Sequence, residues 1–304
     1  MVTPVTFIRT KRNPITYRRA EPTKQPESRT RFGEFVSHYL DVSRFRKNDS
    51  TYDRDLSHLK PLMVLWDSFY LHQITHEQIQ AAQTLWFKTG LAKKTINNRC
   101  VLLSSILRMA YKQRLLSFMP EIPKLRIDRK PPKWFTDEQI RYLLDSVRPF
   151  VRDFVLVLLH TGLRAGELRA LKWQNIDLVN RRIMIEVSKS HRFRVIPIND
   201  ALFEHLKTLR QQAKPHQDYL FEGRSSGQPY TDFYHALKRE LKRLGMSGYV
   251  HALRHTFASR LVQRGVSIYE VKELLGHASV QTTQIYSHLQ NNHLLQAVNV
   301  LNVL

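Results

Sequence analysis

Six residues in the C-terminal half of the chain have side chains suited to chemistry on a phosphate ester: Arg164, Lys189, His251, Arg254, His277 and Tyr286. An arginine guanidinium donates two parallel hydrogen bonds to a phosphate and keeps its charge, so Arg164 and Arg254 can clamp one phosphate between them. A tyrosine phenol has a pKa of ~10 and needs neighbouring cations or a base to act as a nucleophile. The set is therefore suited to breaking a phosphodiester bond by direct attack of Tyr286.

Three of these residues are candidates to assist that attack. Two of them, His251 and His277, are candidates to help the phenol of Tyr286 react. Lysine among other cations has a lowered pKa, so Lys189 can deliver a proton to the departing 5′ oxygen. The cluster is cationic and lacks the paired carboxylates that hold magnesium, so we expect no metal ion and no cofactor.

Helical spacing positions the two central residues of this set. His251 and Arg254 are about one turn apart, so both can reach from one helix face into one site. Gly276 is predicted to end a second helix, because apolar residues within 261–275 recur at core-facing intervals. His277 then lies just past that helix end.

The tyrosine is predicted to lie on a further short helix. Thr282 or Thr283 can cap that helix, which carries Tyr286. His255 and His288 lie beside the candidate residues without a clear task of their own. A histidine nitrogen commonly serves local hydrogen bonding, so we expect both to be structural.

Two earlier segments position the remaining candidates. Gly162 permits a tight turn, after which Arg164 and Glu167 share a helix face at a spacing of three residues. Residues 182–198 alternate apolar and polar side chains around a polar centre and are predicted to form a β-hairpin. Lys189 lies on or beside its turn, on a mobile finger.

Composition indicates a protein that binds a polyanion. The chain of 304 residues carries 48 basic and 26 acidic side chains, a net charge of +22 that points to nucleic acid as the partner. No apolar run approaches the ~20 residues of a membrane span, and the N-terminus lacks the apolar core of a signal peptide. We expect a cytoplasmic protein without a membrane partner. Its single cysteine, Cys100, is predicted to be a buried structural thiol.

The predicted fold class is mainly α, with one small β-hairpin sheet in an otherwise helical second domain. Helical periodicity runs from Thr30 to about Leu116, and four prolines in the following 17 residues forbid a continuous helix there. The predicted division is a basic flexible arm (1–29), a helical domain (30–116), a basic proline-rich linker (117–133) and a larger domain (134–304) whose last residues (289–304) form an apolar helical tail. A disordered arm without function is the alternative for the first segment.

Two basic segments are candidates for contact with DNA phosphates. The first is the start of a predicted helix, where a cap hydroxyl and two cations meet the positive helix end: Lys93, Lys94 and Thr95. A solvated helix start is the alternative reading of these residues. The second is the linker, which can run along or across a duplex so that two lobes close around it. Its candidate residues are Lys124, Arg126, Arg129 and Lys130.

Five stretches of the second domain resemble motifs of the tyrosine recombinase, or phage integrase, family. They occur in the family's order: residues 161–168 resemble its first arginine box, Lys189 its hairpin lysine, 251–258 its His-x-x-Arg box, 274–277 its second histidine box and 282–288 its nucleophile box. The helical domain resembles the family's core-binding domain much more loosely. One such match is a weak signal, whereas five in order are a strong one.

The resemblance implies a reaction and a role for each residue. Tyr286 would attack the scissile phosphate, giving a 3′-phosphotyrosine link and a free 5′ hydroxyl. The other implied roles are transition-state stabilisation by Arg164, Arg254 and His277, general acid for Lys189, general base or hydrogen-bond partner for His251, and orientation of Arg164 by Glu167.

The resemblance also implies partners. The family acts as a tetramer on two specific double-stranded DNA sites through a Holliday junction, and residues 289–304 resemble the tail that docks on a neighbouring protomer. Two other functions remain open, a type IB topoisomerase and a DNA-binding regulator without catalysis. The short N-terminal arm favours a compact recombinase of the Xer or integron type, or one from a small mobile element. Target site, direction of reaction and accessory proteins are not indicated.

Overall fold

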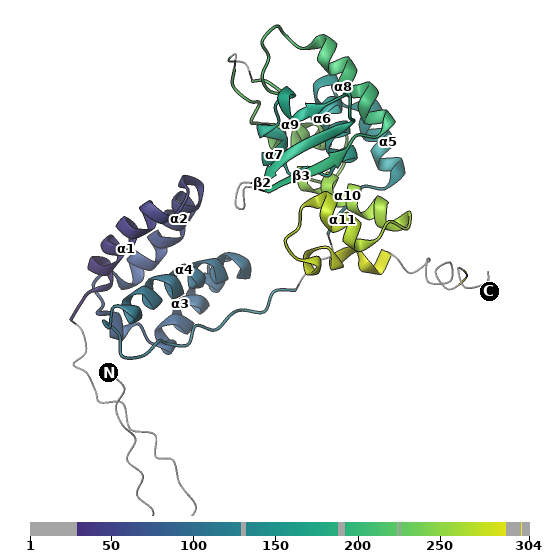
Figure 1. Ribbon diagram of the computed structural model, residues 1–304. Helices are drawn as coiled ribbons and strands as arrows, with labels where there is room; N and C mark the ends of the chain where they lie inside the picture. The colour runs from purple at the N-terminus through teal and green to yellow at the C-terminus, as the bar shows by residue number, and fades with distance from the viewer. Residues whose placement is uncertain are drawn as a thin grey trace, which may run out of the picture. The chain divides into compact units, whose positions relative to one another are not determined.

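The computed structural model describes residues 29–128, 132–187, 192–223, 225, 227–289 and 299. The chain forms two compact units, one ending at Arg129 and one beginning at Lys130 (Figure 1). Several predictions concern residues outside the described ranges: Lys189, Arg129, Lys130, nearly all of the N-terminal arm and nearly all of the tail. In the described part of the chain, no helix is both long enough and apolar enough to cross a bilayer.

The first unit is a small helical bundle. Its elements are α1 (Phe32–Arg46), α2 (Asp49–Trp66), η1 (Leu71–Gln73), α3 (His76–Lys88) and α4 (Lys93–Lys112). Its core is built from aromatic and aliphatic side chains such as Trp66 and Ile106, and Cys100 is buried there, as predicted. The residue before α4 is Ala92, which has no capping side chain, so the predicted cap role of the Thr95 hydroxyl is wrong.

The proline-rich segment after α4 is held on this unit. Asn97 on α4 donates to the carbonyl of Leu125 and accepts from its amide, both at 2.9 Å. Gln83 on α3 donates to the carbonyl of Pro123 at 2.7 Å. Because residues 117–128 contain no helix or strand, these side chains satisfy backbone groups that would otherwise lack partners.

The second unit is mainly helical around a small sheet, which confirms the predicted fold class. Its helices are α5 (Asp137–Ser146), α6 (Pro149–Thr161), α7 (Ala165–Ala170), η2 (Trp173–Asn175), α8 (Asp200–Gln212), α9 (Phe233–Arg243), α10 (Val250–Gln263), α11 (Ile268–Leu275), η3 (Val280–Thr282) and η4 (Gln284–Leu289). The antiparallel sheet has the order β1 (Ile176–Asp177), β2 (Arg182–Val187) and β3 (Arg192–Pro197). Strand β1 was not predicted, since two residues show no alternation.

The apolar helix α6 forms the centre of the second unit. Phe154, Val155 and Leu158 are fully buried, and the predicted alternation of β2 places Ile183 and Ile185 in the same core. Helix α10 packs against α6, α11 and η4, and α10 and α11 lie together in Figure 1. Residues from α10 thus contribute both to the main core and to a smaller core that contains Tyr286.

The segment predicted as one helix over 261–275 is two helices. Helix α10 ends at Gln263, and Gly265 follows with a φ of +86°, a left-handed conformation that glycine adopts without steric cost. The Ser267 side chain accepts from the amide of Glu270 and caps α11. Gly276 ends α11 in the left-handed conformation, as predicted.

Candidate active site

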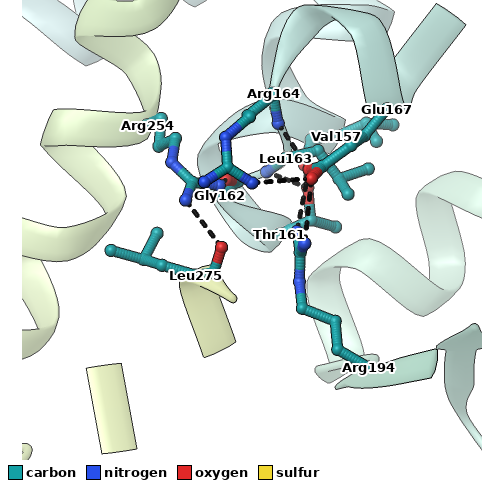
Figure 2. A network of polar contacts seen from close by, with 9 residues as sticks. All are labelled: Val157, Thr161, Gly162, Leu163, Arg164, Glu167, Arg194, Arg254 and Leu275. Carbon is teal, nitrogen blue, oxygen red and sulfur yellow. Dashed lines mark hydrogen bonds and ion pairs between the residues drawn. The ribbon is translucent and has the colours of Figure 1, made fainter. Parts of the chain in front are cut away.

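Arg254 joins the ends of two helices. Its side chain is 2% exposed, and it donates to the carbonyls of Gly162 and Leu275, each at 2.6 Å (Figure 2). These carbonyls lie at the C-terminal ends of α6 and α11, where backbone oxygens lack partners within the helix and carry partial negative charge. Burial and the charge of Arg164 lower the pKa of Arg254 to about 10, so it is charged at neutral pH.

A carboxylate between two arginines fixes the second guanidinium. Arg164 donates to Glu167 at 2.8 Å, as the predicted shared face requires, and Arg194 on β3 donates to both oxygens of Glu167 at 2.9 and 2.8 Å (Figure 2). Burial opposes ionisation of Glu167, but the hydrogen bonds from Arg194 and Arg164 outweigh it and lower the pKa of the carboxyl to about 2. Glu167 is therefore ionised and orients Arg164.

The turn before Arg164 needs glycine. Gly162 has a φ of +63°, and a β-carbon there would collide with the ring of Phe257. The Thr161 hydroxyl donates to the carbonyl of Val157 at 2.6 Å and accepts from the amide of Leu163 at 3.3 Å (Figure 2). These bonds fix the direction in which the chain leaves α6 and enters α7, and hence the position of Arg164.

His277 follows directly after Gly276. Its Nδ1 lies 2.9 Å from the hydroxyl of Thr283, which is fully buried. The hydroxyl of Thr283, one of the two residues predicted to cap the short helix of Tyr286, thus contacts His277. Burial and the charges of Arg254 and Arg164 lower the pKa of His277 to about 4, so the ring is neutral at pH 7 and its Nε2 is left for a ligand.

The phenol of Tyr286 is 1% exposed and lies in the small core beside α10. Its hydroxyl lies 2.6 Å from Nδ1 of His255, which the sequence indicated only as a structural residue. The ring of His251 packs edge-to-face on His255 with centroids 4.8 Å apart. Burial raises the pKa of Tyr286 to about 12, although the nearby charge of Arg254 acts in the opposite direction.

The structure brings together five of the six candidate catalytic residues, from the turn after α6, from α10, from the turn after α11 and from η4. Arg164 and Arg254 both lower the pKa of His251 and of His277, which places the four groups within electrostatic reach of one another. Lys189 is outside the described residues. Arg194 and His255 were missed; the i, i+4 spacing of His251 and His255 on one helix was a usable signal for the latter.

The candidate DNA-contact residues lie on the first unit where the structure describes them. Lys93 and Lys94 are exposed at the start of α4, and Arg126 is exposed in the segment after it. Lys124 lines a groove of about 560 Å³ formed mainly by α1 and α4. Four further cations line that groove: Arg46, Lys47, Arg108 and Lys112. Their positive charge suits a polyanion.

Comparison with protein families gives a match over the second unit. Residues 133–293 match the model of the phage integrase family. Tyrosine recombinase XerA from Thermococcus onnurineus is 30% identical over 257 residues, which are 80% of this chain and 90% of that protein. XerA from Pyrococcus furiosus is 35% identical over 193 residues, 61% of this chain and 65% of that protein.

The fold is also similar to that of solved structures. A lambda integrase tetramer bound to a Holliday junction contains a chain that matches with a TM-score of 0.68 and 21% identity. The match covers 82% of this chain and 78% of the integrase chain. At 21% identity, this match shows that the two chains share a fold.

Proposed function

Because the chain belongs to the phage integrase family of tyrosine recombinases, we propose that it is a site-specific DNA recombinase that cleaves and rejoins DNA through a phosphotyrosine link. The observation that carries this proposal is the meeting of two arginines, a neutral histidine and a buried tyrosine from four separate segments: Arg164, Arg254, His277 and Tyr286. These are the groups that direct attack on a phosphodiester requires.

Each group has a defined task in the cleavage step. Arg164 and Arg254 bind the two non-bridging oxygens of the scissile phosphate, and His277 donates a hydrogen bond from Nε2. Two of the five N–H donors of Arg254 are used by the helix ends, which leaves the other three for the phosphate. As the negative charge grows in the transition state, these fixed donors stabilise it without having to reorganise.

The chemistry conserves the energy of the broken bond. Tyr286 forms a bond to phosphorus, the bond to the 5′ oxygen breaks, and Lys189 supplies the proton that the 5′ oxygen takes up. The product is a 3′-phosphotyrosine with a free 5′ hydroxyl. A 5′ hydroxyl from a second duplex can reverse the step and exchange strands, so no other energy source is needed.

Assembly and DNA contacts follow from the same assignment. The lambda integrase structure is a tetramer on a Holliday junction, which supports a tetramer of this chain on two DNA sites, joined by the tail 289–304. The basic groove on the first unit and the basic segment that follows it supply the cations that contact the phosphates of the duplex. Similarity to XerA over 80% of the chain favours a compact Xer-type recombinase in the cytoplasm.

One experiment separates this function from the two alternatives. The bound DNA site is first found by selecting duplexes from a random pool and mapping the nuclease-protected sequence. A duplex of that sequence, nicked just beyond the scissile phosphate, loses its short 5′-hydroxyl fragment on cleavage and traps the covalent adduct. We expect an adduct with the native chain and none with Tyr286→Phe. A regulator binds the duplex without forming an adduct, and a topoisomerase relaxes supercoiled plasmids that lack the site.

A further inference from the structure

The hydroxyl of Tyr286 has one hydrogen-bond partner in the described part of the chain, Nδ1 of His255 at 2.6 Å. This is a short contact even for a bond to a hydroxyl. The phenol is 1% exposed, so bulk water has little access to its proton. A proton that leaves Tyr286 during attack therefore needs an acceptor within the protein, and the acceptor in contact with it is His255.

His251 is less well placed for that task. His251 and His255 lie one turn apart on α10, where their rings pack edge-to-face, and His255 also contacts Tyr286 through its Nδ1. Arg254, the residue between them that faces the helix ends, holds this part of α10 in position through Gly162 and Leu275. The geometry thus orders the groups as His251, His255 and Tyr286.

We propose, on the basis of the recombinase function above, that His255 is the catalytic base that accepts the Tyr286 proton in the cleavage step. The Tyr286 oxygen forms its bond to phosphorus, its proton moves to Nδ1 of His255, and the bond to the 5′ oxygen breaks with a proton supplied by Lys189. In the rejoining step the phenolate leaves phosphorus and recovers the proton from His255. His251 packs edge-to-face on the His255 ring and positions it.

The charges around His255 favour this role once DNA is bound. The titratable and charged groups that act on it are Tyr286 from η4 and, from its own helix, His251 and Arg254. Burial, His251 and the positive charge of Arg254 lower the pKa of His255 to about 4, so its ring is neutral at pH 7 and its Nδ1 lone pair is free to accept a proton. A phosphate held by Arg164 and Arg254 offsets that positive charge, so DNA binding makes His255 more basic when the base is needed.

The test separates the base from the acid. Single-turnover adduct formation is measured on two nicked duplexes of the selected site, one natural and one with sulfur in place of the bridging 5′ oxygen. A thiolate leaves without taking up a proton, so the sulfur substrate removes the need for the acid Lys189. It does not remove the need for a base. We expect His255→Gln to slow adduct formation by about 10²-fold or more on both duplexes. The Lys189→Ala variant is expected to form the adduct slowly on the natural duplex, and the sulfur duplex is expected to restore its rate.

His288→Gln is the matched control, since His288 belongs to the same motif as Tyr286 but its ring packs on Trp134. It should react at the native rate. The proposal is overturned if the His255→Gln variant forms the adduct at a rate within threefold of the native rate. It is also overturned if the sulfur substrate restores the rate of this variant. A large loss in His251→Gln alone would assign the base to His251. If the native chain forms no adduct, the recombinase function itself fails, which is a separate outcome.

A second measurement covers loss of folding. Melting temperature and affinity for the selected duplex show whether His255→Gln remains folded. If it does not, trifluorotyrosine is placed at position 286 in the otherwise native chain. This phenol is more acidic and depends less on a base, so the decline of the cleavage rate toward low pH becomes shallower if His255 is the base. An unchanged profile contradicts the proposal.

Discussion

Nη1 and Nη2 of Arg194 donate to the two carboxylate oxygens of Glu167 at 2.9 and 2.8 Å. Strand β3 and the first turn of α7 are thereby joined at the residue that also holds Arg164. The Arg194 side chain is 8% exposed and that of Glu167 18%, so water screens this pair little. The position of Arg164 thus depends on a strand residue that follows the hairpin turn.

Replacing Glu167 with Gln should disturb both folding and cleavage. The amide cannot satisfy two guanidinium groups, so the free energy of unfolding is expected to fall by about 3 kcal/mol, as for other buried pairs that lose one partner. Displacement of Arg164 by ~1 Å is expected to slow adduct formation by about 10²-fold. Urea unfolding and the single-turnover assay measure the two effects. Glu138→Gln, which breaks an exposed pair with Arg141, should leave both near native values.

The same carboxylate should make stability depend on pH. The pKa of Glu167 is about 2 in the folded chain against an ordinary 4.5, so its stabilising effect is complete above pH 4.5 and is lost as the pH falls toward 2. At 1.36 kcal/mol per pKa unit the full effect is about 3 kcal/mol. The difference in unfolding free energy between the native chain and Glu167→Gln should therefore shrink on acidification from pH 6 to 3. A constant difference would contradict the assignment.

Much of the site's local geometry followed from sequence because it depends on neighbours in the chain. The turn at Gly162, the end of α11 at Gly276 and the pairing of Arg164 with Glu167 are all set within a few residues. Arg194 was not predicted as a member of the site, because its partner lies 27 positions earlier and β3 reads as an ordinary alternating strand. His255 was undervalued because its contact with Tyr286 depends on how η4 packs against α10.

Gly276 tests the contact between α11 and β3. A β-carbon there would lie 2.8 Å from Nη1 of Arg194, in a backbone with a φ of +64°. Gly245 has nearly the same φ, +66°, and open space around it. Both alanine variants should lose about 1 kcal/mol for the left-handed backbone. Gly276→Ala should lose roughly 1–3 kcal/mol more for overpacking, and it should cleave more slowly. If thermal unfolding showed equal losses of stability in the two variants, the packing of Arg194 would not depend on the space beside Gly276.

Arg254→Lys tests whether geometry or charge matters at this position. A lysine ammonium cannot bridge two helix ends and also present a planar pair of donors to a phosphate. We expect adduct formation to fall by about 10²-fold or more, and the free energy of unfolding to fall by about 2–3 kcal/mol for carbonyls left without partners. Arg260→Lys is the control on the same helix, because its contact with Asp137 is partly exposed. If the two variants behave alike, the bridging role of Arg254 is wrong.

The identity of the nucleophile is tested most directly by the covalent product itself. The adduct trapped on the nicked duplex is digested with trypsin and nuclease, and the modified peptide is sequenced by mass spectrometry. Cleavage after Lys272 releases a peptide beginning at Glu273 in which Tyr286 is the single tyrosine. We predict that this peptide carries a 3′-linked nucleotide on Tyr286. A nucleotide on any other residue, or a link to the 5′ end of the DNA, would contradict the account.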